Sequence, residues 1–242
     1  MIEAHDLAKS FLGRPAVAGI SFEIGAGEIV GFLGTNGAGK STTLRLLAGY
    51  LRPDRGAASI AGHDIVCARR QAQACLGYLP EAAAGFHNLT VLEFLTFAAE
   101  SRGYWGARRR AALARAIEVL DLAPAMAMTL KTLSKGWRQR AWLAQAILHD
   151  PPVLILDEPT DGLDPSQKLG LRRFLRTAAE GRAILMSTHI LEEAEQLCDR
   201  LIIISQGLVV ADQARGTLTD GHGRLAGAFA RLTDAEIERQ GQ

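Results

Sequence analysis

The stretch "EIVGFLGTNGAGKSTTLRLLAGYL", residues 28–51, decides the fold. It opens with a short apolar run typical of a buried strand, passes through a glycine-rich loop, and ends in a segment whose apolar residues have helical spacing. Residues 34–41, "GTNGAGKS", fit the pattern G-x-x-x-x-G-K-[ST] in the strand, loop and helix context that this pattern requires. The stretch therefore predicts an α/β protein with a phosphate-binding loop, or P-loop.

The residue types of this loop suit a nucleoside triphosphate bound with Mg²⁺. Glycines let the backbone N–H groups wrap a phosphate, Lys40 supplies a positive charge for the β- and γ-phosphates, and the Ser41 hydroxyl is a magnesium ligand. The hydroxyl of Thr42 follows at the helix start, near the α-phosphate. The expected nucleotide-binding residues of the loop are Gly34, Asn36, Gly37, Ala38, Gly39, Lys40, Ser41 and Thr42.

A second motif, "VLILDE" at 153–158, is a strand of four aliphatic residues that ends in two acids. In open α/β sheets ligands bind outside the carboxyl ends of the strands, so both carboxylates are expected beside the P-loop. Asp157 suits a direct or indirect Mg²⁺ ligand. Glu158 suits a base that polarises an attacking water.

Patterns outside these motifs predict the rest of the architecture. Two short strands, "MIEAHDL" and "AVAGISFEI", flank the turn-like "LGRP" and form an N-terminal antiparallel part. Residues 82–132 are largely helical, and three helix-to-strand alternations follow, which favours a mostly parallel sheet covered on both faces. The expected division is a core at 1–81 and 150–210, a helical insertion at 82–149, and a tail at 211–242 that contains a short helix near 224–232.

Composition excludes several classes of protein. The 242 residues are 48% hydrophobic with a formal charge of +1, so the whole-molecule field favours neither nucleic acid nor an anionic membrane. The longest apolar runs fall far short of a membrane-spanning helix, and the acidic N-terminus is unlike a signal peptide. Three cysteines without a C-x-x-C pair predict neither disulfides nor zinc, and the arginines at 108–110 read as a solvated helix face.

The stretch "LSKGWRQR" at 133–140 has two interpretations. Ser134 is a typical helix cap, because its hydroxyl accepts from an otherwise unpaired N–H group of the first turn. A helix start with a glycine-containing approach is also a ready anion site. The sequence pattern alone leaves both readings open.

Five motifs in order now resemble those of a known family. They are the P-loop, "LSKGWRQR" in the signature position, "LILDEPT" as the Walker B strand, "DGLDP" at 161–165 as the D-loop, and "STH" at 187–189. Over essentially its whole length the chain is similar to the ATP-binding subunits of ABC transporters. The variants "GYLPE" and "LSKGWRQR", with "STHILEEAEQLCDR", look most like the single-domain ATPases of ABC-2-type exporters, the gliding-motility and drug- or sodium-export group.

The resemblance implies a dimer that faces head to tail, with each ATP between the P-loop of one copy and the signature loop of the other. Ser134 and Gly136 would then contact the γ-phosphate of an ATP held by the partner. Phe11 would stack on adenine, and Asp164 in the D-loop would communicate across the dimer. His189 would bond the γ-phosphate and help hold the attacking water.

Two motifs depart from the family pattern. Glu81 stands after "GYLP" where the family usually has glutamine; a carboxylate can still bind Mg²⁺, so it is assigned to the metal site with Ser41 and Asp157. The common "LSGGQ" has Lys135 and Trp137 in place of its first G and its Q. Ser134 and Gly136 are retained.

The expected function is that of an enzyme, an ATP-hydrolysing subunit that dimerises with itself, or with a homologous ATPase subunit, around two MgATP. It would power a separate transmembrane permease from the cytoplasmic face of the membrane, without binding nucleic acid. One alternative is a soluble ABC-type ATPase acting on nucleic acid or the ribosome, but neither a long coiled-coil insertion nor a second ATPase domain occurs. Another is a P-loop kinase or GTPase; the base-reading N/T-K-x-D motif of GTPases is absent.

Overall fold

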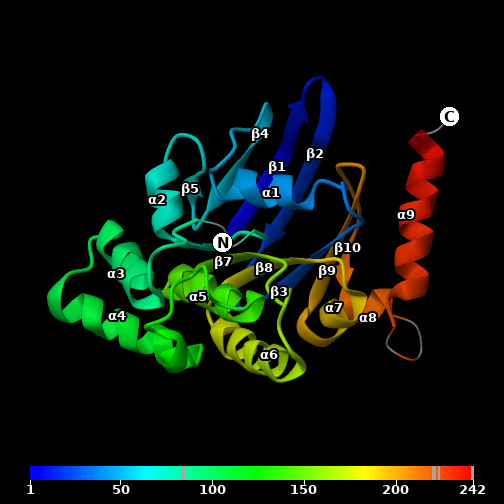
Figure 1. Ribbon diagram of the computed structural model, residues 1–242. Coiled ribbons are helices and arrows are strands. Elements are labelled where there is room, and N and C mark those ends of the chain that lie inside the picture. The colour runs from blue at the N-terminus through cyan, green and yellow to red at the C-terminus, as the bar shows by residue number, and fades with distance from the viewer. Residues whose placement is uncertain (83–84, 220–221, 223, 241–242) are drawn as a thin grey trace.

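A six-stranded sheet forms the centre of the computed structural model, which describes residues 1–82, 85–219, 222 and 224–240 (Figure 1). Its strand order is β10-β9-β3-β8-β7-β6. The five strands from β9 to β6 run parallel, and β10 joins the edge antiparallel to β9. The prediction of a mostly parallel sheet is therefore confirmed. The strands are β3 (Ile29–Leu33), β6 (Leu76–Leu79), β7 (Val153–Asp157), β8 (Ala183–Thr188), β9 (Arg200–Ser205) and β10 (Leu208–Ala214).

The N-terminal part is a second, antiparallel sheet of four strands in the order β2-β1-β4-β5. Its strands are β1 (Ile2–Phe11), β2 (Arg14–Ile24), β4 (Arg55–Ile60) and β5 (His63–Asp64). Leu12 and Gly13 form the two-residue turn between β1 and β2, and both have positive φ, 49° and 77°. Such a turn matches the twist of the paired strands, so pairing continues up to it. Both strands are therefore longer than the two short strands expected from sequence.

The central sheet is buried on both faces, and this explains its continuous apolar strands. Along β3, Val30 and Phe32 face a core shared with the antiparallel sheet, whereas Ile29 and Leu33 face a core shared with the later helices. β7 alternates in the same way. Because successive side chains of a strand point to opposite faces, each strand contributes to both cores.

Helices cover the sheet unequally. Helix α1 (Lys40–Leu47) and helix α2 (Arg69–Ala74) contribute to the core on the side of the antiparallel sheet. The opposite face is covered by α3 (Val91–Ser101), α4 (Gly106–Val119), α5 (Lys135–Ile147), α6 (Pro165–Ala179) and α7 (Leu191–Leu197), with the 3₁₀ turn η1 (Ala123–Ala125) before α5. In Figure 1, α3 and α4 lie at one end of the molecule, and α8 (Arg215–Leu218) and α9 (Ala226–Gln240) lie at the other.

Capping residues fix where three of these helices begin. Thr90 and Glu93 form a reciprocal capping box at α3, and Asp164 and Gln167 form another at α6. At α5 the Trp137 N–H donates to Ser134 Oγ at 3.4 Å, so the capping interpretation of Ser134 is confirmed.

No helix among the described residues is long and apolar enough to cross a membrane.

The structure differs from the sequence expectation in two regions. Between 55 and 79 it contains β4, β5, α2 and β6, for which the sequence predicted no elements, because their short runs mix small and polar residues. In the tail it contains β10 and α8, and α9 extends well beyond the expected 224–232 helix. β10 is an edge strand with half-buried residues, so its alternation is weak. Tail residues 220, 221, 223, 241 and 242 lie outside the described residues.

Candidate active site

The carboxyl ends of β3, β7 and β8 meet at one edge of the central sheet and bring the main motifs together. Leu33 at the end of β3 pairs with Thr188 at the end of β8, and Asp157 at the end of β7 pairs with Ser187. The P-loop follows β3, Glu158 follows β7, and His189 follows β8. Strand register alone therefore places these three segments side by side.

The P-loop has the conformation that its glycines allow. Gly37 and Gly39 have φ of 82° and 105°, in the left-handed region that glycine adopts without strain. A Cβ atom at Gly39 would lie 2.3 Å from the Ala16 carbonyl oxygen, so only glycine fits there. No side chain in the described part of the chain caps α1, so the N–H groups of its first turn are available to an anion.

Lys40 lies folded against the loop that precedes it. Its Nζ donates to the carbonyl oxygens of Gly34 at 2.7 Å and Thr35 at 3.2 Å. Burial lowers the pKa of Lys40, and the carboxylates of Glu158, Asp157 and Glu81 oppose that shift. A cavity of about 310 Å³ adjoins the lysine and is lined by Ala16, Asn36, Gly37, Gly39, Lys40, Ser41, Thr42, Glu81 and Glu158.

Asp157 is fully buried and only half satisfied. Its Oδ1 accepts from the Ser187 hydroxyl at 2.5 Å, whereas its Oδ2 is buried and has no hydrogen-bond partner among the described residues. Burial raises the pKa of Asp157, and hydrogen bonds from Ser187 and Ser41 oppose that shift. An unpaired buried carboxylate oxygen is costly, so this atom points to an additional positive partner.

The donor set around that atom fits Mg²⁺. The Ser41 hydroxyl donates to Glu81 Oε2 at 3.4 Å, and together with Ser187 it opposes the rise in the pKa of Asp157. Hydroxyl and carboxylate oxygens are the ligands that this ion prefers, and it commonly takes one or two carboxylates together with phosphate oxygens. The structure thus brings Ser41, Glu81 and Asp157 together.

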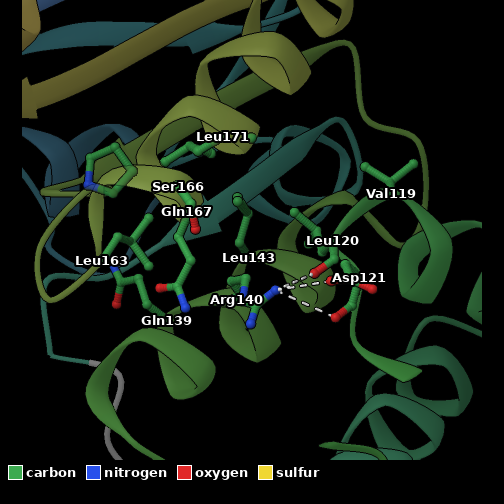
Figure 2. Close-up of a pocket in the computed structure, with 12 residues that line it drawn as sticks. Val119, Leu120, Asp121, Gln139, Arg140, Leu143, Leu163, Ser166, Gln167 and Leu171 are labelled. Atoms are coloured by element: carbon green, nitrogen blue, oxygen red, sulfur yellow. Dashed lines mark hydrogen bonds and ion pairs between the residues drawn. The ribbon is translucent and has the colours of Figure 1, made fainter. Parts of the chain in front are cut away.

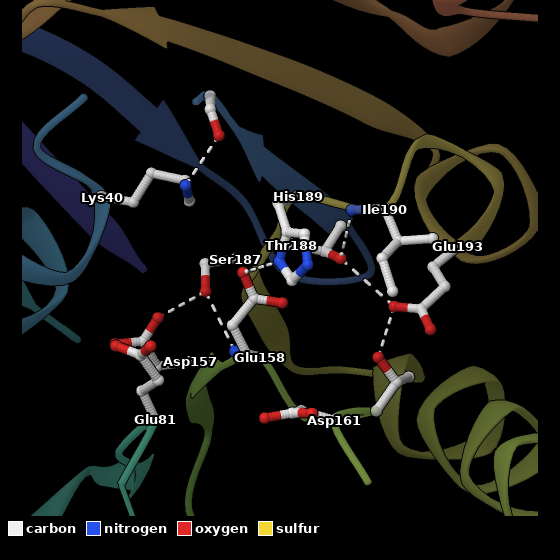
Figure 3. Close-up of polar contacts among 12 residues, drawn as sticks. Lys40, Glu81, Asp157, Glu158, Asp161, Ser187, Thr188, His189, Ile190 and Glu193 are labelled. Carbon is white, nitrogen blue, oxygen red and sulfur yellow. Dashed lines mark hydrogen bonds and ion pairs between the residues drawn. The ribbon is translucent and has the colours of Figure 1, made fainter. Parts of the chain in front are cut away.

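Glu158 faces His189 across the end of the sheet (Figure 3). His189 Nδ1 lies 2.8 Å from Glu158 Oε1. Burial raises the pKa of Glu158, and the contact with His189 opposes that shift. The carboxylate also lines the cavity beside the P-loop, so it is placed to accept a proton or orient a water there.

Three further residues support this site and were not anticipated from sequence. The Glu158 N–H donates to the Ser187 hydroxyl at 3.0 Å, and the Gln139 amide donates to the Glu158 carbonyl at 3.1 Å. Glu193, which is 2% exposed, accepts from Thr188 at 3.2 Å, from Lys168 at 2.8 Å, and from Thr160. Ser187 could have been identified because it belongs to the motif "STH". Nothing in "ILEEAE" distinguishes the buried Glu193 from its exposed neighbour Glu192.

The remaining predicted residues lie apart from this cavity. In the described part of the chain, Ser134 and Gly136 do not line it, and neither does Asp164, whose carboxylate caps α6 through the Gln167 N–H at 2.9 Å. Phe11 lies at the tip of the β1–β2 hairpin with 46% of its surface exposed. One subunit therefore assembles the P-loop, Glu81, Asp157, Glu158 and His189, and leaves the signature residues outside.

The chain is similar to members of one known protein family. The model of the ABC transporter family matches residues 17–161. The chain is 38% identical over 242 residues to the daunorubicin/doxorubicin resistance ATP-binding protein DrrA of Streptomyces peucetius, covering all of this chain and 73% of the relative. It is 39% identical over 218 residues to the Nod factor export ATP-binding protein I of Paraburkholderia xenovorans (strain LB400), covering 90% of this chain and 72% of the relative.

Among solved structures, the fold is similar to that of an ATP-binding subunit of an ABC transporter. The TM-score is 0.87 at 31% sequence identity, over 96% of this chain and 99% of the other. The similarity thus extends beyond the segment that the family model matches.

Proposed function

Because the chain belongs to the ABC transporter family, as an ATP-binding subunit with ATPase activity, we propose that two copies of it close around two ATP molecules to drive a membrane permease. The observation that carries the proposal is the meeting of the P-loop, Asp157, Glu158 and His189 at one sheet edge. This arrangement supplies a phosphate cradle and a base that line one cavity, with the buried carboxylate of Asp157 behind them.

The proposed reaction is transfer of the γ-phosphoryl group of ATP to water. Lys40 and the N–H groups of α1 stabilise the charge on the phosphate oxygens. Glu158 orients and deprotonates the water, and its contact with His189 holds the carboxylate in place. Ser41, Glu81 and Asp157 would hold Mg²⁺, which supplies positive charge to the β- and γ-phosphates when bound.

The second copy supplies the residues that one subunit leaves outside its own site. Ser134 and Gly136 open α5, and we propose that they meet the γ-phosphate held by the P-loop of the partner copy. Asp164 contacts the partner from the segment after β7, and Phe11 stacks on adenine from the hairpin tip. Exposure of the Phe11 ring supports the stacking role.

The names of the relatives support a role in export. DrrA is named for drug resistance, and the relative from Paraburkholderia is named for Nod factor export. We propose that this subunit powers an exporter from the cytoplasmic face of the membrane and that the permease sets the cargo. The division into core, helical insertion at 82–149 and tail at 211–242 is part of the same proposal. The alternative of a nucleic-acid or ribosome ATPase is not favoured.

Ser134→Arg tests the two-copy site. We expect ATP binding to the P-loop to stay near the wild-type level and hydrolysis to fall by at least about 10²-fold, because the substitution removes a hydroxyl from the partner's phosphate site and crowds it. ATP binding and phosphate release by the same preparations measure the two effects. Ser101→Arg, at the exposed end of α3, is the matched control. Joint loss of stability and ATP binding in Ser134→Arg would instead assign Ser134 a purely structural role.

Glu81→Gln tests the proposed metal site. The amide keeps the shape of the side chain but removes a negative charge, so we expect the Mg²⁺ concentration for half-maximal ATPase activity to rise by about tenfold. Titration with Mg²⁺ at saturating ATP measures this, and Glu118→Gln on the exposed face of α4 is the control. Unchanged Mg²⁺ dependence and turnover would rule out Glu81 as a ligand.

A further inference from the structure

The backbone at Glu158 adopts a conformation that needs support. Its φ is 50°, in the left-handed region that a residue with a long side chain rarely occupies. Such a conformation costs on the order of 1–3 kcal/mol and persists only where the surroundings hold it. The turn directs the Glu158 side chain toward His189 and the P-loop cavity, so whatever holds the backbone also positions the carboxylate.

Two side chains hold the Glu158 backbone from opposite ends. On one side its N–H donates to the Ser187 hydroxyl at 3.0 Å. On the other side its carbonyl oxygen accepts from Gln139 Nε2 at 3.1 Å and from the Asp161 N–H at 3.1 Å. Ser187 belongs to the neighbouring strand, whereas Gln139 comes from α5, the helix that Ser134 caps.

The first turn of α5, which precedes Gln139, contacts the chain after Glu158 at further points. Lys135 Nζ forms an ion pair with Asp161 Oδ2 at 2.5 Å. At Gly136 a Cβ atom would lie 3.0 Å from the Gly162 carbonyl oxygen, so the helix start lies directly against that segment. Gln139 lies one turn further along α5 and is 4% exposed. The first turns of α5 and residues 158–162 therefore form one packed unit.

Packing alone does not fix the Gln139 side chain. It lines a cavity of about 190 Å³ between α5, α6 and the end of α4 (Figure 2). Figure 2 shows Gln139 beside Leu163 and Gln167, which line the same cavity. With free space on this side, the hydrogen bond to the Glu158 carbonyl is the interaction that sets the orientation of the amide.

We propose that Gln139 is a positioning residue for the hydrolysis reaction: by holding the Glu158 carbonyl, it keeps the catalytic carboxylate aimed at the attacking water. The inference rests on the proposed function, since it assumes that Glu158 is the base. It also joins two parts of that function, because α5 begins with the residues that meet the partner's ATP. Gln139 thus connects the signature helix to the base of its own subunit through a single hydrogen bond.

Gln139→Met tests the role, since it keeps an unbranched side chain of similar length and removes the donor. We expect kcat to fall by about 10²-fold, the effect of a small misplacement of a reacting group, with KM for ATP unchanged. We also expect the variant to accumulate as an ATP-bound dimer, because binding and closure precede the impaired step. Size-exclusion chromatography with MgATP and steady-state kinetics measure these outcomes.

Gln73→Met is the matched control. Gln73 also donates its amide to a backbone carbonyl, that of Ala48 at 3.0 Å, but does so away from the cavity beside the P-loop. Its kcat should equal that of the wild type. Gln139→Glu, in which an ionised carboxylate cannot donate to the carbonyl, should lose kcat like Gln139→Met and provides the test if the methionine variant does not fold.

Wild-type kcat in both Gln139 variants would overturn the inference, as would parallel loss of ATP binding and dimer formation. Glu158→Gln assayed in parallel separates this outcome from failure of the proposed function. If Glu158→Gln still hydrolyses ATP, or does not form an ATP-bound dimer, the proposed function fails. If Glu158→Gln behaves as expected while the Gln139 variants turn over normally, only the role of Gln139 is wrong.

Discussion

Glu158→Gln is expected to reduce ATP hydrolysis by about 10²- to 10⁴-fold while ATP binding stays intact, because glutamine has nearly the same shape but cannot accept a proton. The carboxylate lies 2.8 Å from His189 and lines the cavity of the P-loop. Among the described residues that line this cavity, Glu81 is the only other carboxylate. With hydrolysis blocked and binding retained, the variant should accumulate as an ATP-bound dimer. Phosphate release and size-exclusion chromatography with and without MgATP measure the two effects.

The control for this substitution is Glu192→Gln, on the exposed face of α7. It makes the same chemical change near the site and should hydrolyse ATP at the wild-type rate. Two results would count against the proposal. Normal turnover of Glu158→Gln would remove Glu158 from the role of base, and a variant that stays monomeric at saturating MgATP would contradict the two-copy arrangement.

Lys40→Ala is expected to weaken ATP binding strongly and to abolish hydrolysis. Lys40 is the only cationic side chain among the described residues that line the P-loop cavity, and only 8% of its surface is exposed. Truncating one partner of a buried, hydrogen-bonded charge pair costs about 2–5 kcal/mol. That corresponds to a loss of roughly 30-fold to several-thousand-fold in ATP affinity.

Binding of a fluorescent ATP analogue, followed by competition with ATP, measures the loss of affinity in Lys40→Ala. A thermal melt without nucleotide checks that the fold survives, since Lys40 also donates to the carbonyls of Gly34 and Thr35. Lys131→Ala removes an exposed lysine and should leave binding unchanged. Retention of wild-type ATP affinity by Lys40→Ala would show that the backbone N–H groups alone hold the phosphates.

Local sequence patterns predicted those parts of the fold whose hydrophobic pattern is strong. β3, β7 and β8 are buried on both faces, so each reads as an apolar run followed by functional residues. The same approach predicted no elements at 55–79 and underestimated the tail. Strands such as β4 and β10 are only partly buried, and their residues are fixed by pairing with strands distant in sequence.

The candidate site likewise combines residues that local sequence patterns predict with residues that they do not predict. The P-loop, Asp157, Glu158 and His189 follow strands directly, so their convergence could be predicted from the rule that ligands bind at the carboxyl ends of parallel strands. Glu81 could be assigned only through the family resemblance, and its contact with Ser41 now supports the assignment. Gln139 lies inside a helix of amphipathic pattern, where a buried glutamine gives no local signal.

The sequence by itself determined the chemistry: which loop binds phosphate, which acids follow a buried strand, and which family the ordered motifs resemble. Only the tertiary structure decided which polar side chains serve that chemistry from a distance. Gln139 reaches the Glu158 carbonyl from 19 residues away in sequence, and Glu193 reaches Thr160 from 33. Hydrophobic periodicity specifies the face that a helix buries, whereas a hydrogen bond between two elements depends on how both pack against a third. In this protein that third element is the central sheet.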